Sequence, residues 1–212
     1  MPPEQAPDTL PAHHLLAIRR LIRFAVVFMM LGMLLGILST EYQKKLRYTP
    51  SHTDAPYLLL PGPDGKLPRQ PVALPAGMMW EAGFDLRILH GHFILIGGVI
   101  PLCLASMLYL LPRCGARPVG PTLLQVGLML YLVGAVAALA LIFYKGLYSL
   151  QSVVQGQFDL ATIHANMFGG SRVVRALAHA LSHTVLAAGL GVLGFALWGA
   201  AGELPTGGKP PA

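Results

Sequence analysis

The chain of 212 residues is 54% hydrophobic and only 11% charged, whereas soluble domains carry about 25% charged residues. This composition predicts an integral membrane protein and excludes an ordinary soluble domain. The formal net charge of +6 comes from Lys and Arg residues scattered at the edges of apolar segments, where they anchor helices and set topology. No basic block indicates a nucleic-acid partner.

The first part of the chain is expected to be a disordered segment followed by a membrane span. Residues 1–17 are polar and proline-rich, and His13 and His14 within them are expected to be solvated. The apolar stretch of about residues 21–40 is too long for the core of a signal peptide and has no small-residue cleavage site, so we expect an uncleaved transmembrane helix. A Pro/Gly-rich loop, residues 41–84, follows and contains His52.

Three further segments have spanning length, at about residues 86–111, 121–144 and 173–201. A tight turn, RCGARPVG, joins the first two of these, and a longer connection with room for one interfacial helix precedes the last. Residues 202–212 are expected to be a disordered tail. The sequence therefore predicts an all-α membrane protein, with residues 18–201 forming a single antiparallel four-transmembrane-helix bundle.

Four histidines lie near the beginning of two predicted spans: His90 and His92 in the second, and His179 and His183 in the fourth. Both spans start from the side of the long loops, so a rise of about 1.5 Å per residue places all four imidazoles in one layer of the membrane. His179 and His183 are four residues apart and share a helix face. His90 and His92 are about 200° apart, so at most one of them faces the fourth helix. His164 lies in the loop above this layer.

Imidazoles at this depth indicate a cofactor, because ionisable groups inside membrane spans are expensive and usually functional. Neutral imidazole is a good ligand for haem iron and for copper, and two imidazoles from facing helices can hold a haem in an apolar pocket. We therefore predict a b-type haem whose axial ligands are His90 or His92 together with His183 or His179. Its expected role is electron transfer, or the sensing of redox state or a gas, without independent catalytic activity.

Two other functions remain open. The same histidines, helped by Met78, Met79 and His164, could bind copper for delivery or for oxidase assembly, since methionine is a copper(I) ligand. Alternatively the chain is a cofactor-free accessory subunit whose histidines make hydrogen bonds across helices. The sequence contains no C-x-x-C-H motif for covalent haem and no G-x-S-x-G, P-loop or H-E-x-x-H motif. The expected partners are membrane lipids, a respiratory-chain protein or cytochrome, and further copies of the chain.

Three pieces of the sequence resemble the uncharacterised bacterial membrane family called domain of unknown function 2871. They are LHGHFILIGG in the second span, YKGLYSLQ after the third, and LSHTVLAAGLGVLG in the fourth. The resemblance covers most of the chain outside its tails and the proline-rich loop. It implies four helices and, by position, points to His90, His92 and His183, with His179 as an addition.

The stretch HGHFILIGGVIPLCLASMLYLLP also resembles one helix of subunit I of the haem-copper oxidases, the helix that carries a low-spin haem ligand near the outer face. The resemblance is confined to this helix, and the paired histidine and tyrosine of that family's copper centre are not found here. It implies a b-type haem near the outer face of a bacterial inner membrane. It also implies cytoplasmic termini, although the raw count of Lys and Arg favours long loops inside the cell.

Overall fold

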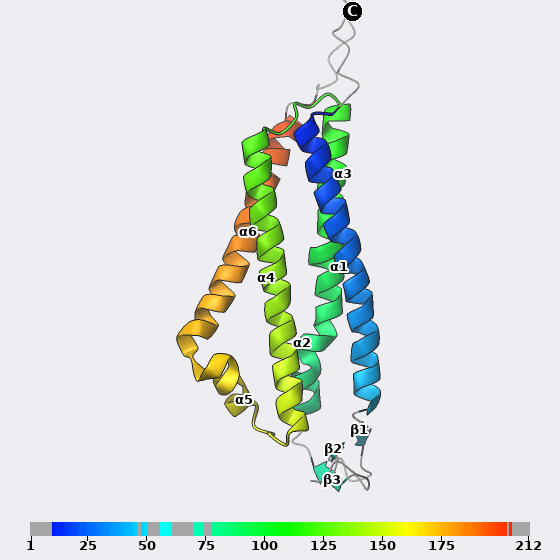
Figure 1. Ribbon diagram of the computed structural model, residues 1–212, viewed down its shortest axis with the longest axis vertical. Helices are drawn as coiled ribbons and strands as arrows, with labels where there is room; N and C mark the ends of the chain where they lie inside the picture. The colour runs from blue at the N-terminus through cyan, green and yellow to red at the C-terminus, as the bar shows by residue number, and fades with distance from the viewer. Residues whose placement is uncertain are drawn as a thin grey trace, which may run out of the picture. The chain divides into compact units, whose positions relative to one another are not determined.

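Helices account for most of the described chain. The computed structural model describes residues 10–45, 48–50, 56–60, 70–73, 78–202 and 204. The helical elements are α1 (Ala12–Lys45), α2 (Met78–His92), the π-helix η1 (Phe93–Val99), α3 (Ile100–Arg113), α4 (Pro121–Val154), α5 (Leu160–Asn166), the 3₁₀ helix η2 (Met167–Gly170) and α6 (Arg172–Gly202) (Figure 1).

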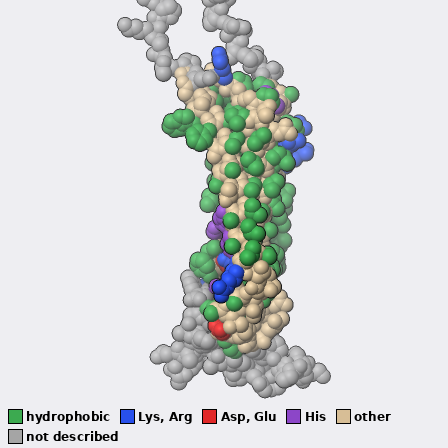
Figure 2. Space-filling model, turned by 90° about the vertical axis from the view of Figure 1, so that its left-hand side faces the viewer, with side chains coloured by type: hydrophobic (Ala, Val, Ile, Leu, Met, Phe, Trp, Pro, Cys, Tyr) green, Lys and Arg blue, Asp and Glu red, His purple; other side chains and the backbone are tan. Residues whose placement is uncertain are grey.

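Four of these stretches are long and apolar enough to cross a membrane. They are Ala12–Leu38, Gly83–Arg113, Pro121–Val153 and Arg172–Gly202. Hydrophobic side chains cover much of the face shown in Figure 2, as expected for helices whose surroundings are lipid rather than water. The predicted fold, an all-α membrane protein built on an antiparallel bundle of four spanning helices, is confirmed.

Between α1 and α2 the chain forms a small antiparallel sheet that the sequence analysis describes only as a loop. Its strands are β1 (Tyr48–Pro50), β2 (Pro56–Leu60) and β3 (Gln70–Ala73), in the order β1-β2-β3. Leu58 of the central strand is paired with Tyr48 on one side and with Val72 on the other. His52 lies outside the described residues.

The first helix begins at Ala12 rather than near residue 21, so the predicted disordered segment is wrong for residues 12–17. His14 is also not solvated: its side chain is only 1% exposed. Its Nδ1 lies 3.2 Å from the carbonyl oxygen of Leu108, and its Nε2 lies 3.2 Å from that of Val119. The Nε2 of His13 is 3.0 Å from the same Val119 oxygen. These carbonyl acceptors hold the polar start of α1 against α3 and the turn that follows it.

Contacts divide the chain into two compact units, and each spanning helix contributes to both. The first unit consists of Met1–Met29, Ile94–Ala138 and Ala180–Ala212, and the second of Met30–Phe93 and Leu139–His179. In the first unit α1, α3, α4 and α6 pack around one apolar core. Its fully buried members include Leu21, Leu108, Leu128, Tyr131 and Leu193.

Glycines bring α4 and α6 together in the first unit. A Cβ atom added at Gly134 would lie 2.3 Å from the backbone nitrogen of Leu186, and one added at Gly189 would lie 2.3 Å from that of Tyr131. Both distances are far below van der Waals contact, so the two backbones touch where only hydrogen atoms separate them. Such small-residue contacts drive helix association in lipid, where burial of apolar surface gives no advantage.

The second span contains the π-helix η1, whose sequence is FILIGGV. Hydrogen bonds in a π-helix run from residue i to i+5, so a carbonyl oxygen near its end loses the partner that an α-helix would provide. The hydroxyl of Tyr131, which is fully buried on α4, donates to the carbonyl oxygen of Ile96. Gly97 and Gly98 face Phe28 and Met29 of α1, with no room for a side chain. The irregular helix is therefore supported from two neighbouring helices.

Replacing Gly189 by alanine is expected to weaken the bundle, because the added methyl group has no space against the backbone of α4. Overpacking of this kind costs about 1–3 kcal/mol, which should appear as a lower thermal unfolding midpoint in detergent, followed by circular dichroism. Gly191→Ala is the matched control, since nothing lies within 4 Å of a Cβ atom there. Equal midpoints for the two variants would contradict the close contact.

Replacing Tyr131 by phenylalanine removes one oxygen atom and leaves the Ile96 carbonyl without its donor. Hydrogen bonds between membrane helices contribute about 0.6–2 kcal/mol, so we expect a clear fall in the unfolding midpoint. Tyr109→Phe, at a 44% exposed tyrosine of α3, should leave the midpoint unchanged. A Tyr131→Phe protein as stable as the wild type would show that η1 does not depend on this bond.

Candidate functional site

Three of the four predicted histidines belong to the second unit, and His183 belongs to the first. His90 and His92 end α2 immediately before η1. His90 is exposed and lies next to α1, where a Cβ atom added at Gly36 would be 3.8 Å from its own Cβ. Since His92 follows about 200° further round the helix, it points away from this contact with α1. The predicted opposition of the two side chains agrees with this arrangement.

The ring of His92 is held by its own helix. Its Nδ1 lies 2.8 Å from the carbonyl oxygen of Ile88, one turn earlier, and the side chain is half-buried. A carbonyl oxygen only accepts hydrogen bonds, so Nδ1 must carry the proton. In the neutral ring the lone pair is then on Nε2, the nitrogen that points further from the backbone.

His179 of α6 repeats this geometry. Its Nδ1 lies 2.8 Å from the carbonyl oxygen of Arg175, again one turn earlier, and its side chain is also half-buried. The same reasoning places the proton on Nδ1 and the lone pair on Nε2. The two imidazoles on different helices of one unit thus share one tautomer.

An aromatic residue from the connection before α6 borders His179. The ring of Phe168 contacts the imidazole edge to face, with centroids 6.4 Å apart. Phe168 adopts a left-handed backbone conformation with φ 58°, which is uncommon for a bulky residue. Its backbone N–H donates to the hydroxyl of Tyr144 at 3.0 Å, and the two rings are 4.8 Å apart. Tyr144 therefore helps to hold the strained turn that places an aromatic ring beside the imidazole.

His183 and His164 have different surroundings. His183 is exposed, and its Nδ1 lies 3.2 Å from the hydroxyl of the buried Ser182. His164 is exposed on α5, and its backbone carbonyl accepts a hydrogen bond from the guanidinium of Arg175. Figure 2 shows histidine side chains that reach the surface of the face it displays.

The short helix α5, which carries His164, starts at an acidic cap. The hydroxyl of Thr162 donates to the carboxylate of Asp159, and the backbone N–H of Ala161 donates to it at 3.0 Å. The Thr162 hydroxyl is the main cause that holds the pKa of Asp159 below its usual value, with help from the backbone bonds and against a smaller effect of burial. A helix is therefore present in the connection between the third and fourth spans, as expected, and its interfacial position stays a prediction.

Positive side chains lie on the long-loop side of both imidazoles in the second unit. Arg87 precedes His92 by five residues, and Arg175 precedes His179 by four. Lys145 of α4 forms an ion pair with Asp85 of α2, with Nζ 3.7 Å from the carboxylate. This end of the unit therefore carries cations at the depth where a membrane helix meets its aqueous face.

Among the described residues, no three or more His, Cys, Asp or Glu side chains come together in a group that could hold a metal ion. This leaves the prediction of a two-ligand haem untested, because a bis-histidine haem needs only two imidazoles. The side chains of Met78 and Met79 lie outside the described part of the structure. Cys103 and Cys114 are free and exposed.

The sequence analysis missed Tyr131 and η1, which support the segment directly after His92. A signal for Tyr131 is present, since a hydroxyl in the middle of a predicted span must find a partner in lipid. No comparable signal exists for the π-helix, because the run FILIGGV reads as an ordinary apolar helix.

Comparison with known proteins adds no relative, since no family model, no curated protein and no solved structure matches the chain. The resemblances to the domain of unknown function 2871 and to subunit I of the haem-copper oxidases therefore stay predictions from the sequence. The geometry and the four spans together define a multi-pass integral membrane protein with imidazoles inside two of its spans.

Proposed function

We propose that this four-span protein binds a haem b, with His92 and His179 as axial ligands, and that it transfers electrons in a bacterial inner membrane. The observation that carries the proposal is the shared tautomer of these two imidazoles. Each ring donates from Nδ1 to a helix carbonyl, which is the second bond that metal-ligating histidines typically make and which raises their basicity as ligands. This choice selects one residue from each predicted pair and leaves His90 and His183 as the alternatives.

The depths of the two histidines fit a single ligand. His92 lies five residues after Arg87 of α2, and His179 lies four residues after Arg175 of α6. At 1.5 Å per residue the two imidazoles are about 8 Å and about 6 Å beyond these arginines along their helices. A haem is large enough to bridge a difference of this size by a small tilt of its plane.

The surroundings of the two imidazoles also suit a haem. Arg87 and Arg175 lie nearer the long-loop end than the imidazoles do, where the two propionates of a haem would point toward water and meet cations. Phe168 beside His179 supplies an apolar wall. When bound, the iron supplies one-electron chemistry, and two permanent histidine ligands favour electron transfer over gas binding. A respiratory-chain protein or cytochrome is the corresponding partner.

The first test is a reduced-minus-oxidised visible spectrum of the purified protein in mild detergent, with metal analysis. We expect the sharp alpha band of a b-type haem in the wild type, and a loss of bound haem of more than about tenfold in His92→Ala and in His179→Ala. His164→Ala is the matched control, because its ring is exposed on α5, outside the spans, and it should keep the full band.

The outcomes separate the competing functions. If His90→Ala or His183→Ala removes the band instead, the ligand assignment is wrong although the haem proposal stands. A featureless spectrum from folded, haem-supplemented protein would refute the haem proposal. Stoichiometric copper in that sample would then support copper delivery, and no metal would support a cofactor-free accessory subunit.

We also propose that both termini face the cytoplasm. Support comes from Arg113 and Arg117 at the short α3–α4 turn and from Arg19 and Arg20 near the start of α1, because basic residues in short segments weigh most in setting topology. Cys114 offers a natural probe of this side, since it is exposed directly after α3.

In a Cys103→Ser variant, a membrane-impermeant maleimide is expected to label Cys114 in inverted membrane vesicles and not in intact cells. The reason is that the label cannot cross the bilayer to reach a cytoplasmic thiol. The double variant lacking Cys114 should remain unlabelled in both samples. Labelling in intact cells would place the termini on the outer side.

A further inference from the structure

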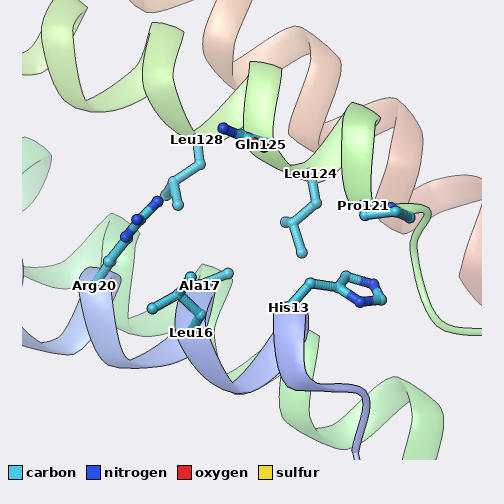
Figure 3. Close-up of a pocket in the computed structure, with 8 residues that line it drawn as sticks. All are labelled: His13, Leu16, Ala17, Arg20, Pro121, Leu124, Gln125 and Leu128. Carbon is cyan, nitrogen blue, oxygen red and sulfur yellow. The ribbon is translucent and has the colours of Figure 1, made fainter.

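A cavity of about 120 Å³ lies between α1 and α4 in the first unit, well apart in sequence from the histidines of the second unit. It combines a charged, an aromatic and an amide side chain with apolar walls. The residues that line it are His13, Leu16, Ala17, Arg20, Pro121, Leu124, Gln125 and Leu128 (Figure 3).

Arg20 gives the cavity its chemical character. Figure 3 shows its side chain reaching from α1 toward α4. In the described part of the chain Arg20 forms no hydrogen bond or ion pair, and the described residues of the first unit include no Asp or Glu that could neutralise it. A guanidinium carries five N–H donors in a planar fork that fits a phosphate oxygen pair. Among the described residues, the positive charge of Arg20 therefore has no counter-ion, and the cavity favours an anion.

The walls restrict the kind of anion. Leu128 points from α4 toward α1 next to the Arg20 side chain, and Leu124 points the same way nearer His13 (Figure 3); both are buried. Leu16, whose side chain is 47% exposed, lines the cavity from α1. Arg20 lies eight residues after the start of α1, about 12 Å along the helix, a depth from which a long side chain reaches the headgroup region. A small hydrated anion would leave the exposed Leu16 side chain without a partner, whereas a molecule with both a phosphate and a hydrocarbon chain would contact the guanidinium and Leu16 together.

We propose that this cavity binds one anionic phospholipid, with its phosphate on Arg20 and its acyl chain along the exposed Leu16 of α1. Basic pockets between membrane helices bind acidic headgroups in this way. Gln125 also lines the cavity from α4, and His13 lines it at the end away from Arg20 (Figure 3). The bound lipid would link α1 to α4 independently of any haem, so the proposal does not depend on the proposed function.

The test titrates the purified full-length protein in detergent with phosphatidylglycerol and follows the thermal unfolding midpoint. The wild type should gain stability in a saturable way, and Arg20→Gln should raise the half-saturating lipid concentration about tenfold, the effect of losing a charge-assisted hydrogen bond. Arg20→Lys, which keeps the charge without the planar fork, should lie between them. Arg23→Gln is the matched control, because Arg23 is an exposed residue of α1 outside the cavity and should remain within about twofold of the wild type.

Three further titrations decide between ligands. Phosphatidylcholine, which has no net charge, should bind at least about tenfold more weakly, and inorganic phosphate alone should give no saturable shift. A shift with inorganic phosphate equal to that with lipid would show a free-anion site, and a larger shift with an isoprenoid quinone would show a quinone site; either result overturns the proposal. Equal effects of Arg20→Gln and Arg23→Gln would show only a general attraction between basic residues and anionic lipid, and would overturn the proposal of a specific site. Unfolding midpoints without lipid show whether each variant is folded.

Discussion

Carbonyl oxygens inside a membrane must find donors within the protein, because lipid supplies none. Polar side chains in the spans face the same constraint, because their N–H and O–H groups must find acceptors within the protein. The resulting hydrogen bonds run from His14 to Leu108 and Val119, from His92 to Ile88, from Ser106 to Leu102, from Tyr131 to Ile96, from Ser152 to Tyr148 and from His179 to Arg175. Where the helix departs from α geometry, in η1, the donor comes from a neighbouring helix. Tyr131 therefore supports the irregular helix η1, and His14 supports the start of α1.

The sequence was sufficient to predict the four spans, because hydropathy measures the property that a lipid environment selects. It was insufficient at the start of α1, where the polar residues His13 and His14 looked like part of a solvated segment. Their carbonyl acceptors, Leu108 and Val119, are about a hundred residues away in the chain. Hydrogen bonds between residues so far apart leave no local pattern in the sequence. The third span was expected to end at Tyr144, and α4 instead continues to Val154.

The sequence predicted which histidines lie in the spans, but it did not predict their tautomers or the aromatic residue beside His179. Helix periodicity alone placed His90 and His92 on opposite sides of one helix, and the contact between His90 and Gly36 of α1 agrees with that. The tautomer of each ring depends on a side-chain rotamer that brings Nδ1 to the carbonyl one turn earlier, and rotamers are set by packing rather than by spacing. The position of Phe168 beside His179 likewise depends on a left-handed turn supported by Tyr144, which no spacing rule indicates.

The bonds that fix these rings do not by themselves account for the choice of histidine. Ser106 and Ser152 donate to the carbonyl four residues earlier at 2.9 and 2.8 Å, so a serine makes the same bond with a smaller side chain and no ionisable group. His92 and His179 make it at 2.8 Å while also bringing a second ring nitrogen into the span. An imidazole is more expensive than a hydroxyl in lipid, and what it adds is the lone pair on Nε2. If Nε2 binds the iron of the proposed haem, that role explains why two helices of one unit carry histidine at positions where a serine would make the same hydrogen bond.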